Sequence, residues 1–192
     1  MSTTDIDCML DLETLSTRPN AIILVIGAIK FSRSGPSLPL DKLNTFYRRI
    51  TIESCNHAGL IADDKTIEWW KQQDKNVRYE ALDNPDRICL RQALEEFSTW
   101  FGSCRYIWAQ SPDFDCTILG EAYNRCKLKV PWEFWNTRDC RTIFDIGGIN
   151  KSHLPTTEKH HALQDCYRQM IGVKLVLDNV SEWIYNYYFK CY

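Results

Sequence analysis

Two carboxylates stand one residue apart near the start of the chain, at Asp11 and Glu13. They close a stretch, residues 6–13, in which apolar positions alternate with more polar ones, and this period of two is typical of a β-strand. Both side chains are therefore expected on one face of the strand. Two carboxylates one strand step apart repel each other and lose hydration, which is costly unless a cation lies between them. We interpret the pair as a candidate Mg²⁺ or Mn²⁺ site, although an isolated Asp-x-Glu more often only ends a strand.

Two further pieces of sequence carry residues suited to the same chemistry. Phe114 and Asp115 fall in the opening turn of a helix that is expected to follow a short strand at residues 105–109. Much later in the chain, His160 precedes Asp165 with four residues between them. Carboxylates supply the oxygen ligands that Mg²⁺ prefers, and a histidine with its usual pKa near neutrality can take a proton from water. Together the three pieces are far more specific than any one of them.

In this order, the three pieces resemble the motifs of the DEDDh (DnaQ-like) family of 3′-5′ exonucleases. Within that family, three stretches look most like the branch that contains phage exonuclease A and a mycobacterial 3′-5′ exoribonuclease. They are MLDLETLSTRPNA from Met9, IGAIKF from Ile26 and TIEWWKQQ from Thr66. The resemblance runs from about Met9 to Met170, which is most of the chain.

The resemblance implies a fold, a reaction and a set of roles. The fold is an RNase H-like α/β domain, and the reaction is hydrolysis of phosphodiester bonds from a 3′ end, which releases nucleoside 5′-monophosphates. Asp11, Glu13, Asp115 and Asp165 would surround two divalent ions, Mg²⁺ or Mn²⁺, and His160 would act as the general base. Two such ions can stabilise both the attacking and the leaving oxygen of an in-line displacement at phosphorus.

Two of these assignments have a close competitor. Asp113 and Asp115 lie two residues apart on the expected helix, so they cannot both face one site. The family pairing of Phe with Asp favours Asp115, and Asp113 is explained as an acid near a helix N-terminus. His160 and His161 pose the same question, and the family spacing before Asp165 selects His160.

Four residues are candidates for binding the substrate. By resemblance, Thr14 and Leu15 would lie against the 3′-terminal nucleotide. Trp69 and Gln73 share a flank of a predicted helix, where Trp69 could stack on a base. Core packing remains the commoner role of a tryptophan. One departure from the family pattern affects the expected contact with the terminal nucleotide. The family often has an Asn or His a few residues before Phe-Asp, whereas this chain has Gln110-Ser111-Pro112 there.

The elements that must position these residues are predicted from periodicity and from turn and cap signals. We expect a mixed five-stranded central sheet flanked by helices, with the first two strands antiparallel because their connection is short. The expected strands are residues 6–13, 21–31, 45–52, 105–109 and 132–135. The expected helices are residues 66–82, 86–101, one that Ser111 and Pro112 begin, 138–146, 161–178 and an aromatic C-terminal helix, about 180–192, that packs on the domain.

Composition limits the class of protein. The chain has 192 residues, which fits one domain, and no stretch is apolar enough to span a membrane. Nine scattered cysteines without a C-x-x-C pair indicate reduced thiols and a cytoplasmic location. With a net charge of −2, the chain lacks the overall basic field of a protein held on nucleic acid by charge alone, so a nucleic acid 3′ end would be held locally. A homodimer is possible, because relatives are often dimers.

Other functions remain open at this point. A catalytically silent module that binds nucleic-acid ends on the same fold would be expected to have lost a ligand, yet all five catalytic positions are present. An endonuclease is disfavoured by the His-x-x-x-x-Asp motif. No motif fixes DNA against RNA, and the likeness to the phage enzyme favours DNA only slightly.

Overall fold

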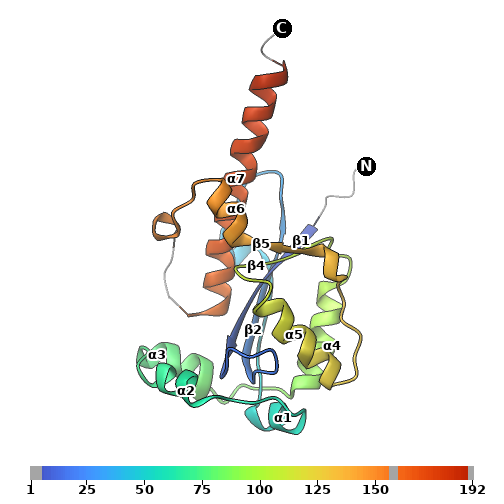
Figure 1. The fold of residues 1–192 in the computed structure, drawn as a ribbon, viewed down its shortest axis with the longest axis vertical. Helices are drawn as coiled ribbons and strands as arrows, with labels where there is room; N and C mark the ends of the chain where they lie inside the picture. The colour runs from blue at the N-terminus through green and yellow to red at the C-terminus, as the bar shows by residue number, and fades with distance from the viewer. Residues whose placement is uncertain (1–5, 156–159, 190–192) are drawn as a thin grey trace.

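The core of the molecule is a five-stranded mixed sheet with the strand order β3-β2-β1-β4-β5 (Figure 1). A computed structural model describes residues 6–155 and 160–189, of which residues 181–189 are described by their backbone alone. Strands β1, β2 and β3 are antiparallel neighbours, whereas β4 and β5 run parallel to β1. The predicted mixed five-stranded sheet is therefore confirmed. The strands are β1 (Ile6–Thr14), β2 (Ile23–Ser32), β3 (Asn44–Arg49), β4 (Ile107–Ala109) and β5 (Thr137–Asp139).

Helices cover both faces of this sheet, as the alternation in β1 requires. Cys8, Leu10 and Leu12 point into an apolar cluster formed with α4 (Leu90–Phe101) and α5 (Asp115–Arg125). Met9 points the other way, into a second cluster formed with α6 (Cys140–Ile146) and α7 (Ala162–Phe189). Asp11 and Glu13 share the parity of Met9, so they lie on the α7 side of β1.

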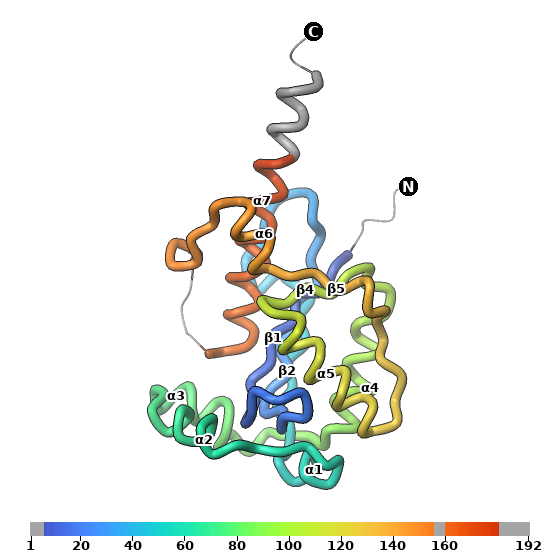
Figure 2. The backbone as a smooth tube through the Cα atoms, viewed as in Figure 1, coloured from blue at the N-terminus to red at the C-terminus, as the bar shows by residue number. Residues whose placement is uncertain are grey.

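Helix α7 lies against β1 and β2 (Figure 2), and a glycine in β2 allows its first turn to approach the sheet closely. Gly27 of β2 is paired with Asp11 in the antiparallel ladder. A Cβ at Gly27 would lie only 2.5 Å from the Cβ of Ala162, the first residue of α7. The missing side chain thus lets the start of α7 contact the sheet directly beside Asp11.

Several predicted boundaries are wrong, each for a local reason. The helix expected over residues 66–82 is broken into α2 (Asp64–Lys71), α3 (Lys75–Arg78) and a π-helical turn (Tyr79–Asp83). Asp74 causes the break, because its side chain accepts from the backbone N–H of Asn76 and starts a new helix. The helix expected from residue 86 begins at Leu90, since Ile88 first forms a parallel bridge with Ile50.

The second half of the chain shows three more differences. The edge strand expected at residues 132–135 is a 3₁₀ turn (Phe134–Asn136) followed by β5, because pairing with β4 begins only at Thr137. Residues 111–114 form a turn rather than the first turn of α5. The helices expected at 161–178 and 180–192 are one helix, α7, to Phe189, and the proposed packing of the C-terminal side chains lies outside the described residues.

The remaining elements are short. They are α1 (Ile52–His57) and 3₁₀ turns at Leu40–Lys42 and Lys151–His153. Among the described residues, no helix combines the length and the apolar character that crossing a membrane requires.

Candidate active site and metal centre

Three carboxylates from two distant parts of the chain meet at the end of β1. Asp11 and Glu13 come from one face of β1, and Asp165 comes from the first turn of α7. One carboxylate oxygen from each of these residues lies within 4.8 Å of the other two. Asp165 reaches the pair because Gly27 lets the start of α7 approach the sheet beside Asp11.

The fourth predicted carboxylate lines the same cavity without joining that group of three. Asp115 is the first residue of α5, is only 4% exposed, and its Oδ1 accepts a hydrogen bond of 3.1 Å from the backbone N–H of Leu12. Asp113, its competitor in the sequence, is exposed and is absent from the cavity wall. The helix start therefore turns Asp115 inward and Asp113 outward.

Not every acid on this face of β1 belongs to the cluster. Asp7 is fully buried, but its Oδ2 accepts from Trp108 Nε1 at 2.7 Å and pairs with Arg33 Nε at 3.0 Å. Asp7 therefore links β1 to Trp108 and Arg33 and is not part of the carboxylate cluster. The three clustered carboxylates instead face a cavity of about 440 Å³.

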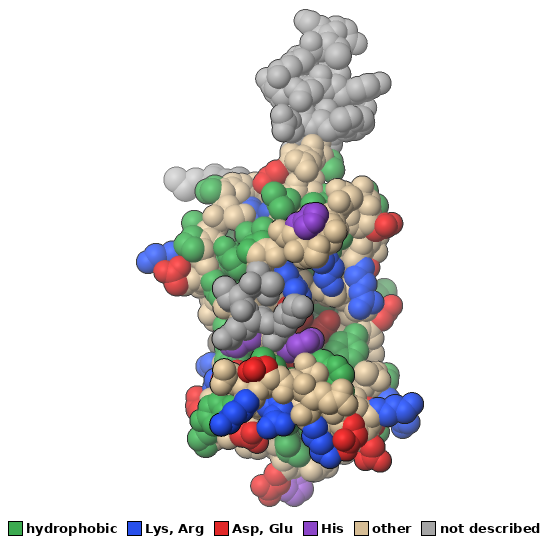
Figure 3. Space-filling view, turned by 90° about the vertical axis from the view of Figure 1, so that its left-hand side faces the viewer, with side chains coloured by type: hydrophobic (Ala, Val, Ile, Leu, Met, Phe, Trp, Pro, Cys, Tyr) green, Lys and Arg blue, Asp and Glu red, His purple; other side chains and the backbone are tan. Residues whose placement is uncertain are grey.

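His160 lies at the rim of this cavity and is held through its backbone. Its φ of +61° is in the left-handed region, and its N–H donates to Asp165 Oδ2 at 3.0 Å. The exposed imidazole meets the Trp69 ring edge to face, with centroids 4.9 Å apart. Figure 3 shows histidine and acidic side chains together in a recess of this face, with basic side chains above and below it.

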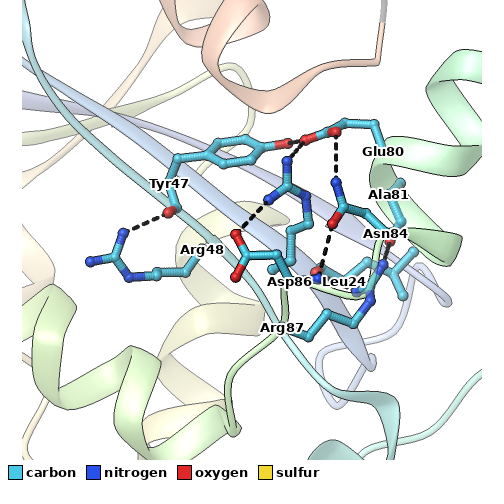
Figure 4. A network of polar contacts seen from close by, with 9 residues as sticks. Leu24, Tyr47, Arg48, Glu80, Ala81, Asn84, Asp86 and Arg87 are labelled. Carbon is cyan, nitrogen blue, oxygen red and sulfur yellow. Dashed lines mark hydrogen bonds and ion pairs between the residues drawn. The ribbon is translucent and has the colours of Figure 1, made fainter.

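His161 does not line the carboxylate cavity and packs instead against a neighbouring network of polar side chains. Its ring stacks on Tyr47 of β3 at 5.2 Å. Tyr47 Oη in turn donates to Glu80 Oε1 at 2.7 Å, and Arg49 pairs with the same carboxylate (Figure 4). Arg87 extends this network, because it donates to the main-chain carbonyl of Leu24, in β2, and to that of Ile50, which follows β3. The network fixes the segment after α3 to the sheet, and His161 packs against it.

Burial and mutual repulsion dominate the electrostatics of the cluster. Burial, followed by the charges of the other acids, raises the pKa of Asp11 and of Glu13 well above the usual range. Burial raises the pKa of Asp115 to about 7. Carboxylates that are this crowded favour a bound cation, which would relieve both the repulsion and the lost hydration. The all-oxygen set of ligands fits Mg²⁺ or Mn²⁺ better than a soft metal.

These shifts give a testable dependence of stability on pH. In the unfolded chain the same acids titrate near pH 4, so between about pH 4 and pH 7 the folded metal-free protein binds more protons than the unfolded one. The free energy of unfolding is therefore expected to fall as the pH rises through this window, by about 1.4 kcal/mol for each unit of net pKa shift. Denaturant unfolding in EDTA at pH 5 and pH 7 measures the fall, and saturating Mn²⁺ at pH 7 should reverse it. Equal stability at both pH values would contradict it.

Two residues of the cavity were not singled out from the sequence. Gln169 is 1% exposed, and its Nε2 donates to Asp11 Oδ1 at 2.9 Å. Arg168 forms an ion pair with Asp165 Oδ1. A signal existed, because Arg168 and Gln169 stand three and four positions after Asp165 and so share its face of α7. Arg141, at the start of α6, also lines the cavity.

The predicted substrate-binding residues divide between an adjoining cavity and the core. A cavity of about 510 Å³ is lined by Thr14, Trp69 and His160, among others. Trp69 is 39% exposed there, whereas Leu15 is buried in the apolar core. Gln73 is not part of this wall, and its Nε2 donates to the carbonyl of Trp69 at 3.0 Å.

The chain matches a known family over most of its length. The sequence model described as the 3′-5′ exoribonuclease Rv2179c-like domain matches residues 6–177. A curated relative, an exodeoxyribonuclease of enterobacteria phage T4, is 22% identical over an alignment of 202 positions, gaps included, that covers 89% of this chain and 88% of the relative.

Solved structures are similar in fold at low sequence identity. The nuclease domain of 3′hExo, a DEDDh family member bound to rAMP, has a TM-score of 0.57 at 13% identity over 93% of this chain and 94% of that one. The zinc-bound complex of Escherichia coli ExoI with single-stranded DNA has a TM-score of 0.64 at 13% identity, over 97% of this chain. The chain spans 43% of that ExoI chain and 64% of cell-death related nuclease 4. At these identities the likeness shows the fold alone.

Proposed function

Because the chain belongs to the family of Rv2179c-like 3′-5′ exoribonuclease domains, DEDDh-type 3′-5′ exonucleases on the RNase H-like fold, we propose that its site hydrolyses single-stranded nucleic acid with divalent metal. It would remove nucleoside 5′-monophosphates one at a time from the 3′ end. The observation that carries this proposal is the group of carboxylate oxygens from Asp11, Glu13 and Asp165, all within 4.8 Å of one another. They lie in a cavity that Asp115 and His160 also line.

The ions would be held by the crowded acids. Asp11, Glu13 and Asp165 would supply the central ligands, and Asp115, which lines the same cavity, would complete the set. When bound, two Mg²⁺ or Mn²⁺ ions stabilise the attacking and leaving oxygens of an in-line displacement. The ion pair of Arg168 with Asp165 keeps a positive charge in the same cavity, where it can bind a substrate phosphate.

His160 would act as the general base at the rim of the cavity. An imidazole nitrogen takes the proton of the attacking water as its oxygen bonds to phosphorus. The bond from phosphorus to the 3′ oxygen of the preceding nucleotide then breaks, and that oxygen leaves with a proton from solvent. The hydrogen bond from the His160 N–H to Asp165 keeps the base at a fixed place relative to the carboxylates.

The cavity lined by Thr14 and Trp69 would receive the terminal nucleoside. We expect Trp69→Ala to raise KM for an oligonucleotide about 5- to 150-fold, since stacking on a base contributes about 1–3 kcal/mol. Trp69→Phe keeps a ring and should retain most of the affinity. Trp135→Ala, which removes an exposed Trp outside this cavity wall, is the matched control. A KM unchanged in Trp69→Ala would exclude stacking.

The reaction is tested with matched single-stranded DNA and RNA oligonucleotides labelled at the 5′ end. A ladder that shortens from the 3′ end and is lost in EDTA supports the proposal, and an uncut circular strand excludes an endonuclease. Binding without turnover, with any metal, would instead indicate a silent module. The family name refers to RNA and the name of the phage relative to DNA, so the DNA preference expected from the sequence stays a prediction that this assay decides.

A further inference from the structure

Two of the described residues that line the carboxylate cavity, Arg168 and Gln169, donate a hydrogen bond to a proposed metal ligand and also leave a buried polar atom unpaired, and of the two it is Gln169 that contacts Asp11. Its Nε2 donates to Asp11 Oδ1 at 2.9 Å. Its Oε1 is buried and has no partner among the residues that the structure describes. The whole residue is 1% exposed and lines the carboxylate cavity.

The orientation of this amide follows from the charge of Asp11. A carboxylate that binds a metal ion is deprotonated and only accepts hydrogen bonds, so in the metal-bound protein the NH₂ end of Gln169 must face Asp11 and the carbonyl end must face away. The alternative orientation would place two acceptor oxygens against each other. A buried carbonyl without a donor costs about 1–3 kcal/mol, so Oε1 needs a donor that the described residues do not supply.

Asp11 differs from Asp115 and Asp165 in the kind of donor that holds its carboxylate. Asp115 accepts from the backbone N–H of Leu12, and Asp165 from that of His160, so main-chain groups hold both. The hydrogen bond to Asp11 comes from a side chain on a different element, α7. Removal of the Gln169 amide would leave Asp11 free to rotate away from its neighbours.

We propose that Gln169 is a positioning residue for the metal centre, which fixes the Asp11 carboxylate through Nε2 and accepts a hydrogen bond from a cavity water through Oε1. The proposal rests on the proposed function. Mg²⁺ and Mn²⁺ keep several waters when carboxylates bind them, which provides the missing donor. Residues that orient metal ligands in this way typically change metal affinity or activity about 10- to 100-fold when they are replaced.

The test is Gln169→Met, which keeps the length of the side chain and removes both polar groups. Mn²⁺ is titrated calorimetrically into the metal-free protein without nucleic acid, and the dissociation constant is expected to rise about 10- to 100-fold. Gln92→Met is the matched control, because exposed Gln92 also donates through Nε2 to a carboxylate at 2.9 Å, that of partly exposed Glu96, outside the cavity. Its Mn²⁺ affinity should stay within about twofold of wild type.

Further measurements separate positioning from a merely structural role. At limiting Mn²⁺, kcat of Gln169→Met should fall while KM for the oligonucleotide is unchanged, and excess Mn²⁺ should restore much of kcat. Unaltered Mn²⁺ affinity with only a lower Tm would overturn the proposal. If Gln169→Met does not fold, Gln169→Asn, whose amide is one methylene too short to reach Asp11, must show the same loss of affinity. Wild-type protein that binds no Mn²⁺ would count against the proposed function itself.

Discussion

Replacement of Asp11 by Asn is expected to lower kcat about 10³-fold or more while making the metal-free protein more stable at pH 7. The loss of activity is expected because the proposed ions, held by ligands such as Asp11, would contribute several kcal/mol of transition-state stabilisation. The gain in stability, on the order of 1 kcal/mol, follows because the substitution removes one of several repelling, desolvated charges. The Asn carbonyl can still accept from Gln169.

These two effects are measured by single-turnover kinetics and by denaturant unfolding in EDTA. Asp41→Asn is the matched control, because Asp41 is exposed and its carboxylate lies 3.8 Å from Lys42 Nζ rather than in a cluster of acids. It should change neither quantity. An Asp11→Asn protein that is less stable than wild type in EDTA would mean that Asp11 stabilises the fold, and retained turnover would mean that it holds no essential ion.

Replacement of His160 by Ala is the second large effect, with an expected loss of about 10²- to 10⁴-fold in kcat. The imidazole is at the cavity rim and is not part of the group of carboxylates proposed to hold the metal, so Mn²⁺ binding measured by calorimetry should be nearly unchanged. The limb of the pH–rate profile that reports an essential base should also disappear. A general base would lose turnover and keep Mn²⁺ affinity when it is replaced, whereas a metal ligand would lose both.

His161→Ala tests the alternative that the sequence left open. His161 stacks on Tyr47, so its loss should lower stability modestly and leave most of kcat. His57→Ala, at the exposed end of α1, is the control for loss of a surface histidine. If His161→Ala removed activity and His160→Ala did not, the roles of the two histidines would be exchanged.

Local patterns made much of this arrangement predictable. Alternation in β1 placed Asp11 and Glu13 on one face, and residues 21–31, which are apolar at both parities, are typical of a strand that is covered on both faces. The spacing from His160 to Asp165 fits a helix start, where a backbone N–H can reach a carboxylate five residues on. These features depend on neighbours in sequence, so one chain suffices to find them.

Other features depend on contacts that a single sequence does not reveal. The edge strand is Thr137–Asp139, not the aromatic residues before it, because pairing with β4 selects the strand. The role of Gly27 depends on Ala162, far along the chain, and Gln169 is notable only once α7 lies against Asp11. Asp74 is a residue type that often caps helices, but apolar residues at helical spacing on both sides of it predicted one continuous helix.

The most direct test of the central claim is the identity of the first product from a strand labelled in its 3′-terminal nucleotide. A metal-dependent 3′-5′ exonuclease built on this carboxylate cluster must release that label as a nucleoside 5′-monophosphate before any other product, with Mg²⁺ or Mn²⁺ and not in EDTA. Label that first appears in a longer fragment or as a 3′-phosphate, or that is released equally well in EDTA, would contradict it.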